Sequence, residues 1–243
     1  MTEPRKSPGS APNRAHREPH SKGREGWLRA GVMGADDGLV STACLMIGVA
    51  ASSAAMNGIL LAGVAGLVAG ALSMAAGEYV SVSSLRDTED ANIAQEKREL
   101  AANSKGELRE LALIYEKRGL KPDLARQVAE QLSEHDVLKA HMRDELGISE
   151  STRSLPFQAA IVSAASFGLA AILPIGALLV SPVSLRIPFI ALSACSGLSL
   201  LGALGGHLGK APMGRAALRV VVGGGLAMAG SALVGRLLGV MGI

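Results

Sequence analysis

The chain has 243 residues and a formal net charge of +3; 49% of it is hydrophobic and 19% is charged. Soluble domains usually carry about 25% charged residues. The charges are also segregated, because 15 of the 21 acidic residues lie between Arg86 and Arg153 and residues 155–243 contain none. This pattern excludes an ordinary soluble enzyme, a disordered chain and a disulfide scaffold. It predicts a membrane protein with one charged insert.

Residues 1–26 are rich in proline, glycine, serine and charge and show no apolar periodicity, which predicts a disordered tail. Five apolar runs follow, and each is long enough to form a helix across a bilayer core of about 30 Å. They cover roughly residues 30–51, 57–85, 155–180, 187–206 and 216–240. No strand pattern is present, so we expect an all-α, five-span transmembrane protein. Its predicted domains are the tail (1–26), spans one and two (27–85), the insert (86–154) and spans three to five (155–243).

Lysines and arginines set the expected orientation. They gather in the tail and in the loop between spans four and five, which carries Lys210 and Arg215, whereas the loop between spans one and two has no charge. The positive-inside rule then places the tail and the insert in the cytoplasm. The same placement accounts for the basic charge without a nucleic-acid partner. The abundance of alanine, glycine and arginine favours a bacterial inner membrane, with a vacuolar membrane as the alternative.

Acidic side chains within the apolar runs are candidates for an ion path, because a carboxylate in a bilayer usually faces a cavity, a partner or an ion. Span one contains Asp36 and Asp37, and span two contains Met74 and Glu78, four residues apart. A thioether beside a carboxylate suits a borderline transition metal better than Na⁺ or K⁺. A carboxylate that binds a metal can also exchange it for a proton. The alternative is that Asp36 and Glu78 lie at the membrane interface and that methionine only fills space.

The insert is predicted to form three helices, over about residues 87–102, 105–118 and 122–146. Its glutamates pair on single helix faces with no lysine or arginine three or four positions away. Such like-charged pairs cost about 0.2–0.5 kcal/mol each unless a cation is shared. The candidate ligands are Glu96 with Glu99, Glu107 with Glu110, and His141, Met142 and Glu145 on the third helix. Carboxylate-rich bundles hold divalent metals in this way, although a solvated acidic face would give the same pattern.

The motifs GADDGLVS in span one and GALSMAAGEYVSVSS in span two, followed by the glutamate-rich insert, resemble the vacuolar iron transporter family over about residues 27–243. The resemblance implies a five-span protomer that forms a homodimer, with the ion path near the dimer interface. It also implies export of Fe²⁺, and often Mn²⁺, from the cytoplasm in exchange for protons. It gives path roles to Asp37 and Met74 and a metal-collecting role to Glu96, Glu99, Glu107, Glu110, Met142 and Glu145. His141 stands where the family pattern leads us to expect another methionine.

We therefore expect a proton-coupled divalent-metal exporter and not an enzyme, with Fe²⁺ and Mn²⁺ as the bound and transported ions and no prosthetic group. Its partners are these ions, protons, the bilayer and a second copy of the chain. Its expected metal ligands are Glu96, Glu99, Glu107, Glu110, His141, Met142 and Glu145, and its expected path residues are Asp36, Asp37, Met74 and Glu78. One alternative is a membrane-anchored di-iron oxidase with a ferritin-like insert, although the insert lacks the repeated Glu-x-x-His spacing of such sites. A passive metal channel is another.

Overall fold

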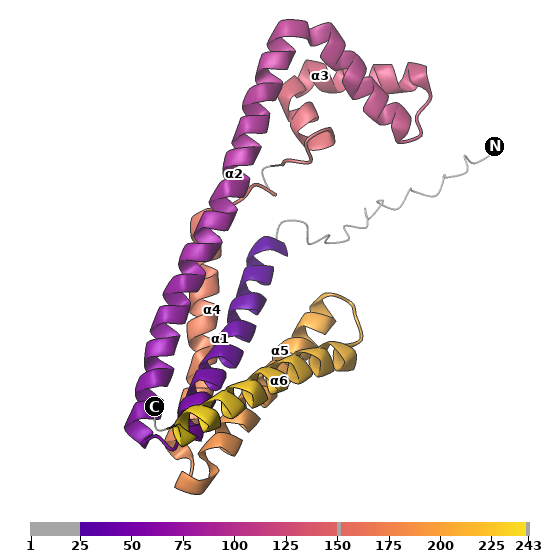
Figure 1. Ribbon diagram of the computed structural model, residues 1–243. Helices are drawn as coiled ribbons and strands as arrows, with labels where there is room; N and C mark the ends of the chain where they lie inside the picture. The colour runs from indigo at the N-terminus through magenta and orange to yellow at the C-terminus, as the bar shows by residue number, and fades with distance from the viewer. Residues whose placement is uncertain (1–24, 150–151, 242–243) are drawn as a thin grey trace, which may run out of the picture.

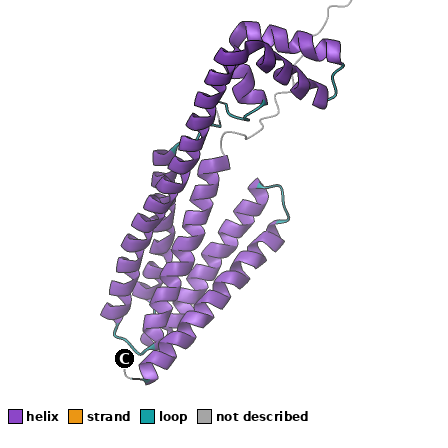
Figure 2. Ribbon diagram, turned by 45° about the horizontal axis from the view of Figure 1, so that its top comes forward, coloured by secondary structure: helices purple, strands orange, loops and turns teal. Residues whose placement is uncertain are grey.

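A computed structural model describes residues 25–149 and 152–241, and within these ranges the chain is helical and contains no strand (Figures 1 and 2). The predicted tail at residues 1–26 lies outside the described residues except for its last two positions, which begin the first helix. The elements are α1 (Glu25–Ala51), α2 (Met56–Lys117), α3 (Pro122–Asp144), α4 (Pro156–Val180), the short 3₁₀-helix η1 (Val183–Leu185), α5 (Arg186–Leu208) and α6 (Met213–Val240).

Five of these helices are long and apolar enough to cross a membrane: α1, the first part of α2, α4, α5 and α6. The predicted all-α fold with five spans is confirmed. Helix α1 lies at the centre of the bundle and packs against α2, α4, α5 and α6. Its buried face contributes Ala43, Met46 and Ile47 to a core that is completed by residues such as Ile190 and Leu178. Burial of such side chains contributes about 1.5–3 kcal/mol each in water; within lipid, close packing takes over that role.

The two ends of the bundle differ in their attachments. The insert, the start of α1 and the loop between α5 and α6 all lie at one end, as Figure 1 shows. The short connections from α1 to α2 and from α4 to α5, together with the end of α6, lie at the other. The basic residues that set the expected orientation, Arg29 and Lys210 among them, therefore share an end with the insert.

Helix α2 is 62 residues long and runs from the membrane bundle directly into the insert. It is regular until Asn103, whose φ of −148° and ψ of 60° break the helix. The side-chain Oδ1 of Asn103 accepts a hydrogen bond from the backbone N–H of Gly106 at 3.0 Å, so Asn103 caps the helical segment that follows. This break lies where the sequence analysis separates the first two helices of the insert.

Helix α3 also contains a break, which the sequence analysis did not anticipate. Asp136 has a φ of −163° and a ψ of 93°, and its Oδ1 accepts a hydrogen bond from the N–H of Lys139 at 2.9 Å. Aspartate is a preferred N-cap because its carboxylate satisfies a backbone donor in the first turn. The last part of α3 is therefore a separate short helix with its own direction. The helix ends before Gly147, whose φ of 69° favours glycine.

The return from the insert to the membrane bundle is fixed by polar contacts between α2 and the residues that precede α4. Arg153 pairs with Asp90, and the guanidinium of Arg86 donates a hydrogen bond to the backbone oxygen of Ser154 at 3.2 Å. The hydroxyl of Ser154 in turn donates to Glu89 at 2.7 Å. These contacts hold the base of the insert against the start of α4.

Candidate functional site

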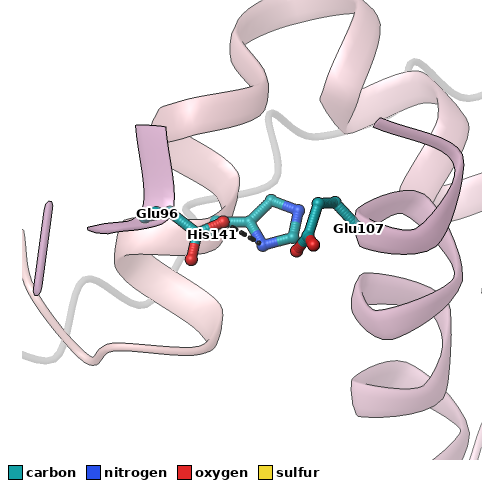
Figure 3. A group of neighbouring side chains, drawn as sticks. All are labelled: Glu96, Glu107 and His141. Carbon is teal, nitrogen blue, oxygen red and sulfur yellow. Dashed lines mark ion pairs between the residues drawn. The ribbon is translucent and has the colours of Figure 1, made fainter. Parts of the chain in front are cut away.

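Three side chains from different parts of the insert converge into a cluster that could hold a metal ion. Glu96 lies on the first segment of the insert, Glu107 follows the break at Asn103, and His141 lies on the short helix after Asp136. Their potential ligand atoms all lie within 4.8 Å of one another, and Figure 3 shows the imidazole between the two carboxylates. Ligand atoms about 2.1 Å from one ion can be at most about 4.2 Å apart, so a small side-chain movement would close the site.

The hydrogen bonding of the cluster leaves ligand atoms available. Nδ1 of His141 lies 2.8 Å from Oε2 of Glu145 and 3.0 Å from Oε1 of Glu96. Within the described part of the chain, Oε1 of Glu96 is buried and has no hydrogen-bond partner beyond this ion pair, and Nε2 of His141 is buried without any hydrogen-bond partner. Buried polar atoms are normally satisfied. A buried carboxylate oxygen and a buried imidazole nitrogen without hydrogen bonds are atoms that a metal ion could use as ligands.

Burial and like charge both act on the carboxyls of this cluster. Glu96 is 2% exposed, and burial, followed by the charge of Glu145, raises its pKa above the ordinary value of 4.5. Burial and then the charge of Glu110 likewise raise the pKa of Glu107. A bound cation would reverse both effects, because it stabilises the ionised forms. The imidazole of His141 therefore does not fully offset the repulsion between these carboxyls, and the cluster favours binding of a further cation.

A hydrogen-bond network fixes the end of α3 next to the cluster. The carboxylate of Asp144 accepts hydrogen bonds from the Tyr115 hydroxyl at 2.7 Å and from Arg118 at 2.7 Å, and it also accepts from Arg143. Burial opposes ionisation of Asp144, but these donors outweigh it and hold its pKa at about 2. Because Asp144 precedes Glu145 and is one turn from His141, the network positions both of these cluster residues.

The remaining insert residues expected to bind metal lie outside this group. Glu99 is exposed, and its Oε1 accepts a hydrogen bond from Gln95 at 2.9 Å. Glu110 is also exposed. Met142 lines a separate cavity that also includes Asp136 and Ile148. The structure therefore brings Glu96, Glu107, His141 and Glu145 together and leaves Glu99, Glu110 and Met142 apart from them.

A second site lies within the membrane bundle. A cavity of about 250 Å³ is lined by Asp37 and Ser41 of α1 and by Met74 of α2. Phe167 of α4 lines it as well, and Gly70 is packed so closely against the Phe167 ring that any larger residue there would collide with it. The carboxylate and the thioether that the sequence analysis selected from two different helices thus share one cavity.

Two other expected path residues are not among those that line this cavity. Asp36 is half-buried, and its Oδ1 is buried with no hydrogen-bond partner in the described structure. Glu78 is half-buried one helical turn beyond Met74, towards the insert. Both lie between the cavity and the end of the bundle that carries the insert.

The cavity also contains polar residues that the sequence analysis missed. Ser41, Thr42 and Ser73 line it, and Thr42 Oγ1 is buried without a hydrogen-bond partner among the described residues. Ser41 follows Asp37 by four residues, so its place on the same helix face could have been read from the sequence. No sequence feature marked Thr42 or Ser73 as cavity residues, because short hydroxyl side chains are common in membrane helices.

An all-α membrane protein with an intramembrane carboxylate and thioether, and with a carboxylate–imidazole cluster outside the bundle, belongs to the class of membrane proteins that handle metal ions. A sequence model of the VIT family matches residues 28–236. The vacuolar iron transporter of Acanthamoeba castellanii is 44% identical over 214 residues, which are 85% of this chain and 77% of that protein. The vacuolar iron transporter homolog 2 of Arabidopsis thaliana is 35% identical over 221 residues, which are 90% of this chain and 88% of that protein. The chain belongs to the VIT family, and the resemblance seen in the motifs is confirmed.

Proposed function

We propose that the protein exports Fe²⁺, and also Mn²⁺, from the cytoplasm in exchange for protons. Membership of a transporter family supports movement of a metal ion across the membrane. The observation that carries the finer proposal is the cavity shared by Asp37 and Met74 within the membrane bundle. A carboxylate and a thioether together suit a borderline transition metal, and the carboxylate can accept a proton when the metal leaves.

In this proposal the insert faces the cytoplasm and collects the ion. Three segments of the insert contribute Glu96, Glu107 and His141 to one cluster. Carboxylate and imidazole ligands together bind Fe²⁺ and Mn²⁺. Burial, and after it like-charge repulsion, raises the pKa of both glutamates, so the cluster would exchange metal for protons as the local pH falls. Glu99 and Glu110, whose charges act on Glu107, would then add negative charge near the cluster.

The protein would act as a homodimer. Met33, Asp37, Ser41 and Leu45 follow one another at four-residue spacing along α1, and all four are exposed on the single protomer. An ionised aspartate that faced lipid would cost several kcal/mol, so this stripe needs a polar cover. A second copy that places its own stripe opposite would supply that cover and would complete the ion path between the two protomers.

Metal flux in proteoliposomes tests this function. The full-length protein should accumulate Mn²⁺ inside liposomes whose interior is acidic, and collapse of the pH gradient should reduce the rate to that of protein-free liposomes. Asp37→Asn should lower the rate at least about tenfold, because one charged ligand contact is worth about 1.5–3 kcal/mol. Asp87→Asn is the matched control, since Asp87 is an exposed aspartate of the insert.

The outcomes separate the alternatives. Flux that does not respond to the pH gradient would identify a passive channel. Oxygen consumption upon addition of Fe²⁺, without flux, would identify the membrane-anchored oxidase. Equal flux in Asp37→Asn and in the wild type would remove Asp37 from the path.

A further inference from the structure

Two arginines share a cavity at the end of the bundle remote from the insert. The cavity has a volume of about 480 Å³ and lies where α1 ends, α2 begins, α5 begins and α6 ends. Arg186 and Arg236 line it together with the hydroxyl-bearing Ser53 and Ser184. The rest of the lining is apolar and includes Ile187. The polar part of this lining therefore consists of hydrogen-bond donors without any carboxylate.

Among the residues that the structure describes, no acidic side chain lies near these arginines. Residues 38–77 and 155–243 contain no aspartate or glutamate. Asp37 precedes the end of α1 by 14 residues, which is about 21 Å of helix. Within the described ranges, neither Arg186 nor Arg236 forms an ion pair or a side-chain hydrogen bond, and Nε of Arg186 is buried without a partner.

Arg186 is half-buried and Arg236 is exposed at the mouth of the cavity. Two positive charges that line one cavity repel each other, and an anion bound between them would relieve this repulsion. A buried guanidinium N–H without an acceptor adds a desolvation penalty to this repulsion. The planar fork of arginine matches the oxygens of a phosphate, to which it donates two parallel hydrogen bonds. The cavity therefore suits an anion with several acceptor oxygens, and no side chain in the described part of the chain supplies one.

We propose that this cavity binds a phosphate group and that the phosphate belongs to the headgroup of an anionic phospholipid. The cavity lies at the ends of membrane-spanning helices, the level at which lipid headgroups meet the bundle. Its apolar lining fits the glycerol and upper acyl carbons of a lipid better than a hydrated free ion. Binding would also explain why two arginines occupy the end of the bundle that is otherwise poor in basic residues, against the usual bias.

Native mass spectrometry of the full-length protein in detergent tests this site, with phosphatidylglycerol as the probe. A glycolipid with the same acyl chains and no phosphate serves as the comparison lipid. The wild type should retain phosphatidylglycerol and not the glycolipid. The double variant Arg186→Gln/Arg236→Gln should weaken apparent binding of phosphatidylglycerol about tenfold or more, since two charge-assisted contacts are lost.

The double variant Arg215→Gln/Arg219→Gln is the matched control, because it removes the same charge from α6 at the insert end. It should bind within about twofold of the wild type, as expected for charges whose contribution is only long-range and screened. The variant Arg186→Lys/Arg236→Lys keeps the charge without the planar fork and should bind with intermediate affinity, which also guards against loss of folding.

Competition with inorganic phosphate distinguishes the source of the phosphate. Displacement of phosphatidylglycerol by millimolar phosphate would identify a free-phosphate site with the same chemistry, whereas no displacement supports the lipid headgroup. Equal binding of phosphatidylglycerol and the glycolipid by the wild type would overturn the proposal. Equal loss of phosphatidylglycerol binding in the two glutamine variants would also overturn it.

Discussion

Replacement of Glu96 by glutamine should separate metal binding from folding. Glutamine has almost the shape of glutamate but carries no charge, and the Glu96 carboxylate lies 3.0 Å from the imidazole of His141 in a buried cluster. Loss of one charged ligand is worth about 1.5–3 kcal/mol, which corresponds to metal binding about 10- to 100-fold weaker. The stability of the metal-free protein should not fall, because burial raises the pKa of Glu96 and so disfavours its ionised form in the fold.

Isothermal titration of the full-length protein in detergent with Co²⁺, which does not oxidise in air as Fe²⁺ does, measures the affinity. Thermal unfolding without metal gives the stability. Glu134→Gln is the matched control, because Glu134 is an exposed acid on α3. Co²⁺ affinity of Glu96→Gln within about twofold of the wild type would refute the assignment of the cluster. An equal loss in both variants would show that only the overall negative charge matters.

Three further outcomes are expected. Metal affinity should fall as the pH drops towards the raised pKa of Glu96, because protons then compete for the ligand; titrations at two pH values check this. Asp144→Asn should lower the free energy of opening of α3, as measured by hydrogen exchange, by about 2 kcal/mol at neutral pH. That difference should shrink as the pH falls below about 4 and vanish below about 2, since the pKa of Asp144 is about 2 in the fold and 3.8 otherwise; a constant difference would contradict the ion-pair account. Gly38→Ala should destabilise the bundle by about 1–3 kcal/mol, because its methyl group would collide with the Phe167 backbone, whereas Gly77→Ala, with open space around it, should not.

Much of the fold follows from the sequence because its signals are local. The length of an apolar run and the absence of charge suffice to place a membrane helix, and all five spans are present. The predicted helix ends at residues 118 and 146 are each followed by a glycine, and both Gly119 and Gly147 adopt the positive φ that glycine tolerates. Gly66 and Gly70, four residues apart in α2, pack closely against Leu45 of α1 and Phe167 of α4, as small residues at this spacing in a membrane helix commonly do.

The candidate metal cluster was only partly predictable, because it depends on how the insert turns back on itself. Spacing within a helix shows that Glu96 and Glu99 share a face, but it does not show that the fold buries the first and leaves the second in solvent. The break at Asp136 was the missing information. It gives the end of α3 a new direction, and His141 becomes fully buried as a result. A capping aspartate within a polar stretch has the same sequence appearance as any solvated acid, so the local pattern could not reveal the turn.

The unbroken course of α2 from the bundle into the insert gives the two sites a common geometry. Met74 and Glu96 are 22 residues apart on this helix, which corresponds to about 33 Å along the axis and about 40° around it. Glu78, four residues after Met74, lies at about the same angle from Met74 around the helix axis as Glu96 does. One side of a single helix thus carries a candidate ligand from each site and an acid between them. The distance between Met74 and Glu96 is about six turns of one helix. The breaks at Asn103 and Asp136 lie beyond Glu96, so a twist of the first insert segment would be transmitted to Met74 without passing through a hinge.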